Sequence, residues 1–514
     1  MSQLSSNNTR IAKNTLFLYF RMMVTMAVSF FTVRVVLDTL GVVDYGLYNV
    51  VGGIVVMFSF LSGTLSTAAQ RYFAYDLAKG DQARLQSTFC LTITIYFLLG
   101  ILIFVLAETF GLWFLQNKLV IPKDRISSAF WVFQFSIVSF IITMFAVPFN
   151  ALIIAHEQMN VYAYVSIVEV VLKLLVVYFL ILFSSDKLIL YALLLLIVTI
   201  LVNTIYILYC KRKYESIRLR FYWEKKLFKE IASYSGWNLF GALAGVFNSQ
   251  GVNIILNLFF GPVVNAARGI AYQISTAINQ FVQNFLVASR PQITKYYALG
   301  DSEKMHELIF QTTKFSFLLL SIITVPVLLE TPFILSFWLK EVPEFTIVFT
   351  RLILINALVD CLSYPLMAAA QATGKIKYYQ SIVGSIMILN LPVSYLMLNF
   401  GLSAEAVFYI SIGNSIVCLF VRLILLNRMI KLSIGYFFTK VVLISFSCFA
   451  FAYVIPKVLT INFQSNVYRF FVSIFTSTLV LTSVTYFIGL TNFERESIQQ
   501  AFKRKFKKYA EKNN

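Results

Sequence analysis

The chain has 514 residues, of which 59% are hydrophobic and only 13% are charged, and its mean hydropathy is +0.78. A water-soluble fold of this length needs far more polar surface, so the composition excludes soluble enzymes and nucleic-acid-binding proteins and leaves a polytopic membrane protein. In a membrane protein the net charge of +19 is informative through the positions of the basic residues along the chain.

Fourteen segments are long and apolar enough to cross a bilayer, since a spanning helix needs about 20 apolar residues. In chain order they are 14–37, 46–69, 87–115, 128–154, 161–183, 188–209, 231–258, 266–289, 309–330, 346–369, 379–398, 403–426, 439–459 and 468–489. Turn-forming residues separate them, for example Gly41 with Asp44 and Gly261 with Pro262. The sequence thus predicts an all-α integral membrane protein with about 14 transmembrane helices.

The basic residues are distributed unequally between the two ends of these helices. Of the 42 Lys and Arg residues, 28 lie in one alternating set of connecting segments and 6 in the opposite set. Lys and Arg are concentrated in cytoplasmic segments, so the first set is predicted to be cytoplasmic. An even number of spans then places both termini in the cytoplasm.

The two halves of the chain resemble each other at an offset of 220 residues. Gly41 aligns with Gly261, and Gly80-Asp81 aligns with Gly300-Asp301. Several matches at one offset indicate a duplicated unit. Because six crossings return the chain to its starting side, we expect two six-helix lobes of the same orientation around a central cavity, plus two C-terminal helices without counterparts.

These features predict five regions, of which the linker and the tail are basic. The regions are an N-terminal lobe (1–210), a basic cytoplasmic linker (211–230), a C-terminal lobe (231–430), helices 13 and 14 (431–490) and a basic cytoplasmic tail (491–514). The tail interleaves Phe and Tyr with Lys and Arg, which favours contact with anionic membrane lipids. Binding to a protein partner is the alternative.

Charged residues inside the predicted spans are the first candidates for function, because charge within a bilayer is costly. Arg21 and Arg34 lie 13 residues apart on the first span. Arg34 reaches Asp38 at i+4, so an ion pair near the interface competes with a functional role. Arg21 has no acidic neighbour on its helix, and we expect it to face a watery cavity. Arg268 opens the eighth span near its outer end.

Two carboxylates lie near the middle of other spans. Glu169 and Lys173 stand at i,i+4 on the fifth span, where the pair serves either packing between helices or substrate and ion contact. Asp360 precedes a helix-breaking Pro365 and is a candidate site for H⁺ or Na⁺, with a buried hydrogen bond to a neighbouring helix as the alternative.

The seventh span carries a polar stripe at helical spacing. Asn248, Asn253 and Asn257 lie roughly on one face. Such a stripe suits sugar hydroxyls or water, and hydrogen bonding between helices is the alternative.

The motifs that the sequence lacks argue against an enzyme. No GxxxxGK[ST], HExxH, DxD or GxSxG occurs, and the two histidines, His156 and His306, lie in connecting segments without a partner. The five cysteines show no CxxC spacing, so neither a disulfide framework nor a metal site is expected. We expect no enzymatic activity and no cofactor other than a coupling ion.

The N-terminal quarter of the chain carries a recognisable pattern. The residues from Arg34 to Gly41 lead into Asp44-Tyr45-Gly46-Leu47-Tyr48, and Arg71-Tyr72 is followed by Gly80-Asp81. Together with the two repeated lobes, this pattern resembles the Wzx-type polysaccharide and O-antigen flippases of the multidrug/oligosaccharidyl-lipid/polysaccharide exporter (MOP) superfamily. By topology the resemblance covers essentially the whole chain, whereas the specific motifs occupy only its start.

The resemblance implies a function and a set of partners. A flippase of this family exports undecaprenyl-pyrophosphate-linked oligosaccharide from the inner leaflet of the bacterial inner membrane by alternating access, in contact with membrane lipids and other polysaccharide-assembly proteins. It also implies a cationic cavity lined by arginines of the first and eighth helices, which correspond by helix to Arg21 and Arg268. Arginine forks bind phosphate bidentately, so the chemistry agrees.

Three other functions compete with this interpretation. A MATE-like exporter of cationic drugs shares the double lobe but needs an acidic cavity. An integral-membrane polymerase or glycosyltransferase needs a sizeable external loop, and the external loops predicted here are short. A purely structural scaffold leaves the repeat and its internal charges unexplained.

Overall fold

A computed structural model describes residues 2–156, 158–183, 186–214, 220–374, 376–463, 467–491 and 494–496, apart from the side chains of residues 2–21 and of scattered helix positions. Within these residues the chain is helical and contains no strand. The first helices are α1 (Ser2–Val56), α2 (Ser59–Lys79), α3 (Gln82–Leu106), α4 (Leu112–Asn117), α5 (Ile126–Ala155), α6 (Met159–Leu182), α7 (Lys187–Lys213), α8 (Lys225–Phe260) and α9 (Pro262–Ala298). The remaining ones are α10 (Ser302–Leu329), α11 (Thr331–Trp338), α12 (Thr346–Cys361), α13 (Tyr364–Ala372), α14 (Ile376–Asn399), α15 (Ala406–Ile430), α16 (Ile434–Tyr436), α17 (Leu443–Leu459) and α18 (Val467–Val484).

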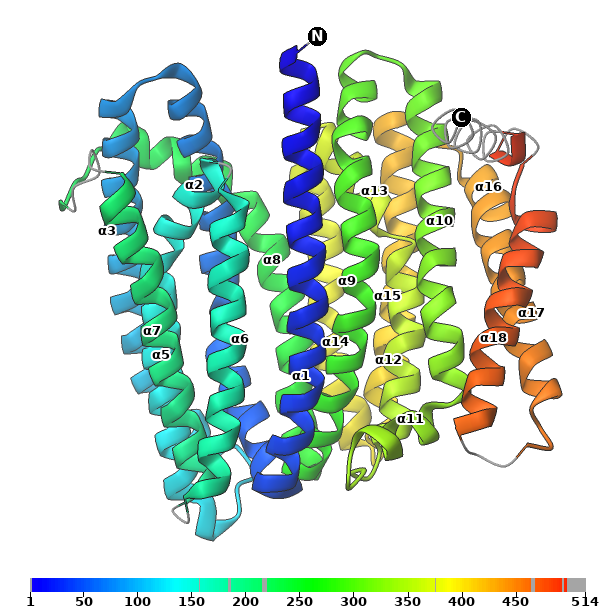
Figure 1. Ribbon diagram of the computed structural model, residues 1–514, viewed down its shortest axis with the longest axis horizontal. Coiled ribbons are helices and arrows are strands. Elements are labelled where there is room, and N and C mark those ends of the chain that lie inside the picture. Colours follow the sequence, from blue (N-terminus) through cyan, green and yellow to red (C-terminus); the bar gives the residue numbers. More distant parts are fainter. Residues whose placement is uncertain are drawn as a thin grey trace, which may run out of the picture. The chain divides into compact units, whose positions relative to one another are not determined.

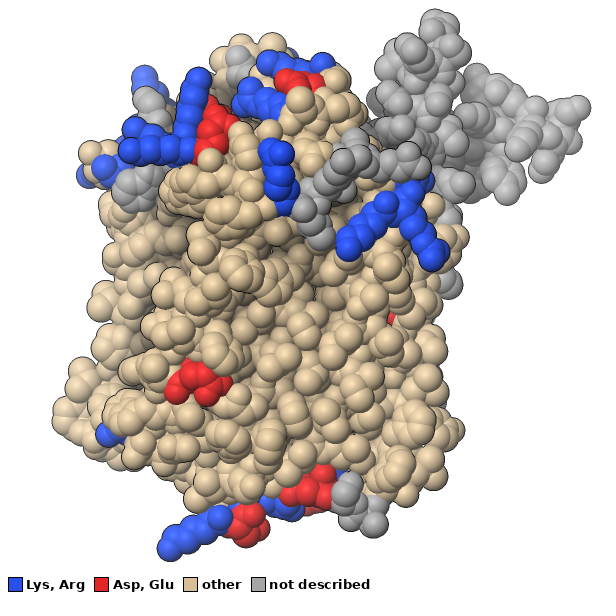
Figure 2. Space-filling view, turned by 90° about the vertical axis from the view of Figure 1, so that its left-hand side faces the viewer, with Lys and Arg blue, Asp and Glu red and all other residues tan. Residues whose placement is uncertain are grey.

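The predicted all-α membrane fold is confirmed. In the described part of the chain, 12 helical segments are long and apolar enough to span a membrane. The predicted count of 14 is not confirmed, because α9 and the region of α2 fall outside these 12 segments although both are helical. Figure 2 shows a broad face with few charged side chains between two charged edges, as expected where lipid covers the protein.

The chain divides into two compact units, which we describe separately. The first unit comprises residues 1–273, 338–346 and 380–410, and the second comprises 274–337, 347–379 and 411–514. In the first unit α5 packs along α7, and α6 lies against α1 and α7 (Figure 1). The division by sequence repeat into 1–210, 211–230, 231–430, 431–490 and 491–514 stays a prediction, and most of the tail lies outside the described residues.

The glycines matched at the offset of 220 residues have matching backbone conformations. Gly41 has φ 78° and ψ 170°, and Gly261 has φ 77° and ψ −172°. Side chains disfavour this region, so glycine allows each helix to break where the sequence predicts a turn. Asp81 and Asp301 likewise both cap the following helix, accepting hydrogen bonds from the amides of Arg84 and Lys304. The local geometry therefore repeats along with the sequence.

The motif after Gly41 takes part in a partly buried ionic corner of the first unit, in which Asp44 is the buried member. Arg125 lies between two carboxylates, at 3.0 Å from Asp44 Oδ2 and 3.2 Å from Asp186 Oδ2. Ser128 donates a 2.6 Å hydrogen bond to Asp186. Burial raises the pKa of Asp186. The hydrogen bonds from Ser128 and two backbone amides, together with the charge of Arg125, lower this pKa by more, so the net pKa is below its usual value. The corner joins the break in α1 to the ends of α5 and α7.

The predicted linker is partly helical and packs on the first unit. Helix α8 begins at Lys225, before the predicted start at residue 231, and residues 215–219 lie outside the described part. Leu227 and Ile231 join an apolar cluster with Ala68, Leu91 and Ile95. Because this apolar contact orders the polar first turns of α8, a hydropathy window missed the true start of the helix.

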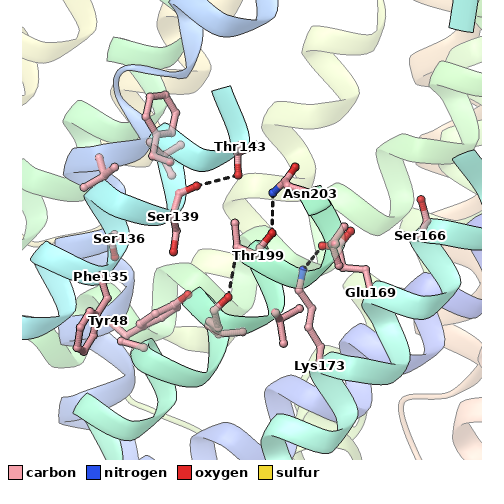
Figure 3. A pocket seen from close by; sticks show the side chains of 18 of the residues that line it. Tyr48, Phe135, Ser136, Ser139, Thr143, Ser166, Glu169, Lys173, Thr199 and Asn203 are labelled. Atoms are coloured by element: carbon pink, nitrogen blue, oxygen red, sulfur yellow. Dashed lines mark hydrogen bonds and ion pairs between the residues drawn. The ribbon is translucent and has the colours of Figure 1, made fainter. Parts of the chain in front are cut away.

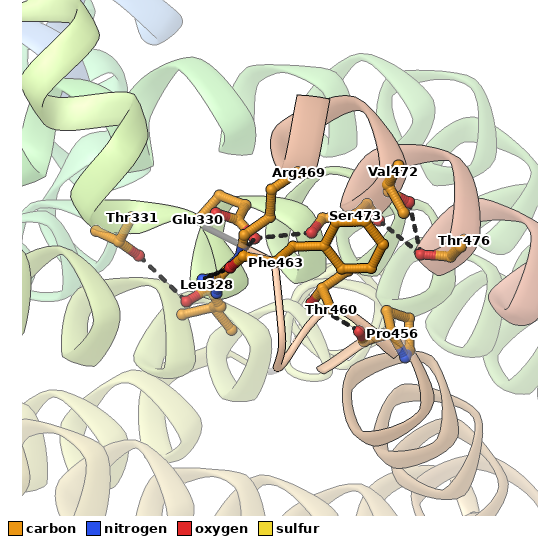
Figure 4. A network of polar contacts seen from close by, with 10 residues as sticks. All are labelled: Leu328, Glu330, Thr331, Pro456, Thr460, Phe463, Arg469, Val472, Ser473 and Thr476. Atoms are coloured by element: carbon orange, nitrogen blue, oxygen red, sulfur yellow. Dashed lines mark hydrogen bonds and ion pairs between the residues drawn. The ribbon is translucent and has the colours of Figure 1, made fainter. Parts of the chain in front are cut away.

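In the second unit, two ion pairs with buried carboxylates fasten α18 and the segment that follows it to α10 and the residue just after it. Figure 4 shows Glu330, just after α10, between Arg469 and Ser473 of α18, at 2.9 Å and 2.7 Å. Farther along α10, Lys314 Nζ lies 2.6 Å from Glu494 Oε2, and both side chains are buried. The C-terminal helices are therefore a fixed part of this unit.

We expect Arg469→Ala to destabilise the second unit markedly, because it removes the cation that faces the buried carboxylate of Glu330. Leaving a buried charge without its partner typically costs about 3 kcal/mol or more. Thermal unfolding of the detergent-purified protein measures the effect. Lys304→Ala, which breaks the exposed pair with Asp301, is the control and is expected to change little. Equal unfolding temperatures for the two variants would contradict the structural role of Glu330.

Candidate functional site

The arginines predicted on the first span have different positions in the structure. The side chain of Arg21 lies outside the described residues. Arg34 is exposed, and the carboxylate of Asp38, its expected i+4 partner, pairs with Lys340 from the segment after α11. Arg34 therefore does not lie in a closed site within the first unit.

Arg268 is the buried cation of the first unit. Its side chain is 5% exposed, and it donates a hydrogen bond to the carbonyl oxygen of Ser249 on α8. Its guanidinium stacks 4.0 Å above the ring of Tyr272. Nε has no hydrogen-bond partner, and in the described part of the chain no carboxylate pairs with Arg268. Both recorded partners are uncharged, so the positive charge is not neutralised within the unit.

The asparagine stripe of α8 is used for packing. Asn265 Nδ2 donates to Asn253 Oδ1 at 2.8 Å, and Asn257 Nδ2 donates to Asn265 Oδ1 at 3.1 Å. Asn257 also pairs with the backbone of Val120. Asn248 accepts a hydrogen bond from Asn390 of α14. The sequence leaves open whether these side chains contact sugar hydroxyls or water, or join helices. The geometry of Asn248, Asn253 and Asn257 favours hydrogen bonding between segments.

Asp360 belongs to a polar cluster in the second unit and is not isolated within the membrane. Asn356 Nδ2 donates a 3.0 Å hydrogen bond to Asp360 Oδ2. From α15, Ser415 acts on the carboxyl group as a hydrogen-bonding partner and Arg422 acts through its charge. Arg422 is 5% exposed, and its Nε has no hydrogen-bond partner. Sequence reasoning missed Arg422, because 62 residues separate it from Asp360.

The helix break predicted near Pro365 lies directly beside this cluster. Helix α12 ends at Cys361, and α13 begins at Tyr364 after a turn in which the amide of Ser363 bonds the carbonyl of Asp360 at 2.9 Å. Such discontinuous helices form ion sites in transporters, so the cluster is a candidate for ion coupling.

Glu169 and Lys173 form the predicted ion pair, with a distance of 2.6 Å. Their side chains remain 37% and 44% exposed, so they are not packed between helices. They line a cavity of about 440 Å³ in the first unit, within the about 300–1,000 Å³ typical of small-molecule sites. Figure 3 shows both side chains on the wall of this cavity, with Thr199 and Asn203 nearby.

The cavity is lined by polar side chains from three helices at the same helical spacing. They are Ser136, Ser139 and Thr143 on α5, Ser166, Glu169 and Lys173 on α6, and Thr199, Asn203 and Tyr206 on α7. Spacings of three and four residues place each triplet on one helix face. The spacing of each triplet is visible in the sequence. That the three triplets line one cavity becomes clear only when the three helices are placed together.

A further intramembrane carboxylate, Glu108, lies outside the cavity. It belongs to a π-helical turn, Ala107–Gly111, that continues α3, and it accepts a 3.2 Å hydrogen bond from Gln134 of α5. Among the described residues no group of three His, Cys, Asp or Glu side chains is placed to hold a metal ion. The five cysteines are buried and form no disulfide among the described residues.

Comparison with known proteins identifies related sequences and folds. Residues 11–297 match the model of a family described as polysaccharide biosynthesis protein. No curated protein matches the chain.

Several solved transporter structures resemble the chain. An inward-facing multidrug resistance MATE family transporter of the MOP superfamily is 13% identical, with 80% of this chain and 98% of that chain covered and a TM-score of 0.66. A MATE structure in complex with MaD3S is 14% identical, with coverages of 82% and 96% and a TM-score of 0.59. A MOP superfamily transporter from Pyrococcus furiosus, described as having a binding pocket of reverse polarity, is 14% identical, with coverages of 82% and 96% and a TM-score of 0.57. At these identities the likeness shows a shared fold.

Proposed function

Because the chain belongs to the polysaccharide biosynthesis protein family and has the fold of MOP superfamily transporters, we propose that it is a flippase for lipid-linked oligosaccharide. Its substrate is an undecaprenyl-pyrophosphate-linked repeat unit of O-antigen, capsule or exopolysaccharide. The protein moves this unit across the bacterial inner membrane by alternating access, with both termini in the cytoplasm.

The observation that carries the proposal is that no carboxylate of the described residues neutralises the charge of Arg268. A buried cation is costly unless an anion accompanies it, and the contacts of Arg268 are a carbonyl oxygen and an aromatic ring. A pyrophosphate supplies the missing negative charge and accepts bidentate hydrogen bonds from a guanidinium. The open Nε of Arg268 leaves a donor for this purpose.

The charge balance argues against export of cationic drugs. The carboxylates proposed for transport each have a nearby base, since Glu169 pairs with Lys173 and Asp360 lies near Arg422. Neither site therefore presents the excess negative charge that a cationic drug requires. We propose that Asp360, with the Glu169–Lys173 pair as a second candidate, couples transport to H⁺ or Na⁺.

The test is delivery of undecaprenyl-linked oligosaccharide to the outer leaflet in cells that lack their own flippase. We expect the intact protein to restore delivery and Arg268→Ala to lower it at least about tenfold, as expected when a charge-assisted hydrogen bond is lost. Arg268→Lys keeps the charge but not the fork and is expected to fall between them.

Arg428→Ala removes an exposed arginine and serves as the control for overall charge. Membrane levels of all variants are matched before comparison. Normal delivery by Arg268→Ala would contradict the role of this residue. Failure of the intact protein to deliver any glycan, together with reduced accumulation of a cationic dye, would favour drug export instead.

A further inference from the structure

We infer that the polar cavity of the first unit is a glycan-binding site that holds one or two sugar units of the transported oligosaccharide. This inference rests on the proposed function and adds a second contact region to it, since Arg268 is not among the residues lining the cavity. Arg268 then recognises the pyrophosphate, and the cavity recognises the sugar.

Several polar side chains of the cavity lining form their hydrogen bonds and ion pair within their own helices. Thr143 donates its hydroxyl to the carbonyl of Ser139, and Thr199 donates to the carbonyl of Leu195, each within its own helix. Asn203 donates to Thr199 on the same helix. The Glu169–Lys173 pair also stays within α6. Packing between helices therefore does not explain why these polar groups lie inside an apolar bundle, where each is costly.

The chemistry of the lining fits a neutral polyhydroxylated ligand. Hydroxyl groups that donate to their own backbone retain lone pairs that accept hydrogen bonds from sugar hydroxyls. Glu169 supplies a carboxylate, which accepts from two neighbouring hydroxyls, and Lys173 supplies donors and cancels the charge. Asn150, at the same wall, has a buried Oδ1 without a hydrogen-bond partner. A site with this balance favours neither a cation nor an anion.

The apolar part of the lining matches the other surface of a sugar. Tyr48, Phe135, Phe140 and Tyr206 come from α1, α5 and α7 and contribute aromatic rings to the cavity wall. Aromatic rings provide large apolar contact area, and tyrosine adds a polar hydroxyl. A pyranose ring has C–H faces and a rim of hydroxyls, so the cavity offers a partner for both.

The test is binding of the soluble oligosaccharide released by mild acid from the lipid-linked pool of the cells in which the protein delivers glycan. Equilibrium dialysis of the labelled oligosaccharide against the full-length protein in lipid nanodiscs gives the affinity. We expect Glu169→Gln to weaken binding about tenfold, since hydrogen bonds to a charged acceptor are the stronger ones. Thr199→Val is expected to weaken binding several-fold.

The matched controls are Glu108→Gln and Thr109→Val, which make the same chemical changes on the π-helical continuation of α3, at positions that do not line the cavity. Both are expected to bind within twofold of the intact protein. If glycan is delivered in cells but the cavity variants bind like their controls, or the intact protein does not bind the oligosaccharide, the inference is wrong and the proposed function stands. If no glycan is delivered, both are wrong.

Discussion

Replacing Arg422 with glutamine is expected to destabilise the second unit and to lower transport at least about tenfold, because it removes a buried cation whose charge acts on the Asp360 carboxyl. Asp360→Asn is expected to destabilise for the same reason, since it leaves the buried guanidinium without a carboxylate. Thermal unfolding and outer-leaflet delivery are measured for both variants.

The double variant Asp360→Asn/Arg422→Gln separates stability from function. Removing both charges is expected to recover much of the unfolding temperature, since neither buried group is then left without its partner. Delivery is expected to stay low, because the proposed coupling needs the carboxyl of Asp360. Recovery of delivery together with stability would contradict a coupling role and leave the cluster a structural one. Full stability of either single variant would contradict the electrostatic contact itself.

The second large effect is expected at Gly46, in the motif that follows Gly41. A Cβ atom at this position would lie 1.9 Å from the carbonyl oxygen of Pro262, which is a backbone atom that cannot rotate away. Gly46→Ala therefore has to separate α1 from the start of α9, where Asn265 donates a hydrogen bond to Asn253. We expect the amount of folded protein recovered from membranes to fall several-fold.

Gly52→Ala is the matched control on the same helix. A Cβ atom at Gly52 would meet nothing within 4 Å, so this variant is expected to fold like the intact protein. Size-exclusion chromatography of the solubilised protein measures the folded fraction of each variant. Normal recovery of Gly46→Ala would contradict the close approach of the two helices.

The membrane-spanning fold was predictable because it depends on local composition. Apolar runs and turn residues such as Gly41 and Gly261 gave the helices and their breaks, since hydropathy and backbone freedom are properties of short segments. Helix ends were less predictable. The structure continues α2 to Lys79 and begins α8 at Lys225, because polar turns are ordered there by packing and not by the bilayer. A hydropathy window has no signal for such turns.

The candidate sites were only partly predictable, because contact between helices is not a local property. The Glu169–Lys173 pair was predicted from i,i+4 spacing, and the structure adds that the pair lines a cavity. Asp360 was predicted without Arg422, since only the fold brings the charge of Arg422 on α15 near the carboxyl group of Asp360 on α12. Arg268 was predicted by position on its helix, but its lack of a counter-ion required the fold.

The most direct test of the proposed function is translocation by the purified protein in liposomes. Labelled undecaprenyl-pyrophosphate-linked oligosaccharide is placed in both leaflets, and its exposure to a membrane-impermeant glycosidase outside the vesicles is followed with time. We predict that protein-containing vesicles expose nearly all of the label, whereas protein-free vesicles and vesicles with the Arg268→Ala variant expose only the outer half. Equal exposure with and without the intact protein would contradict its assignment as a flippase for lipid-linked oligosaccharide.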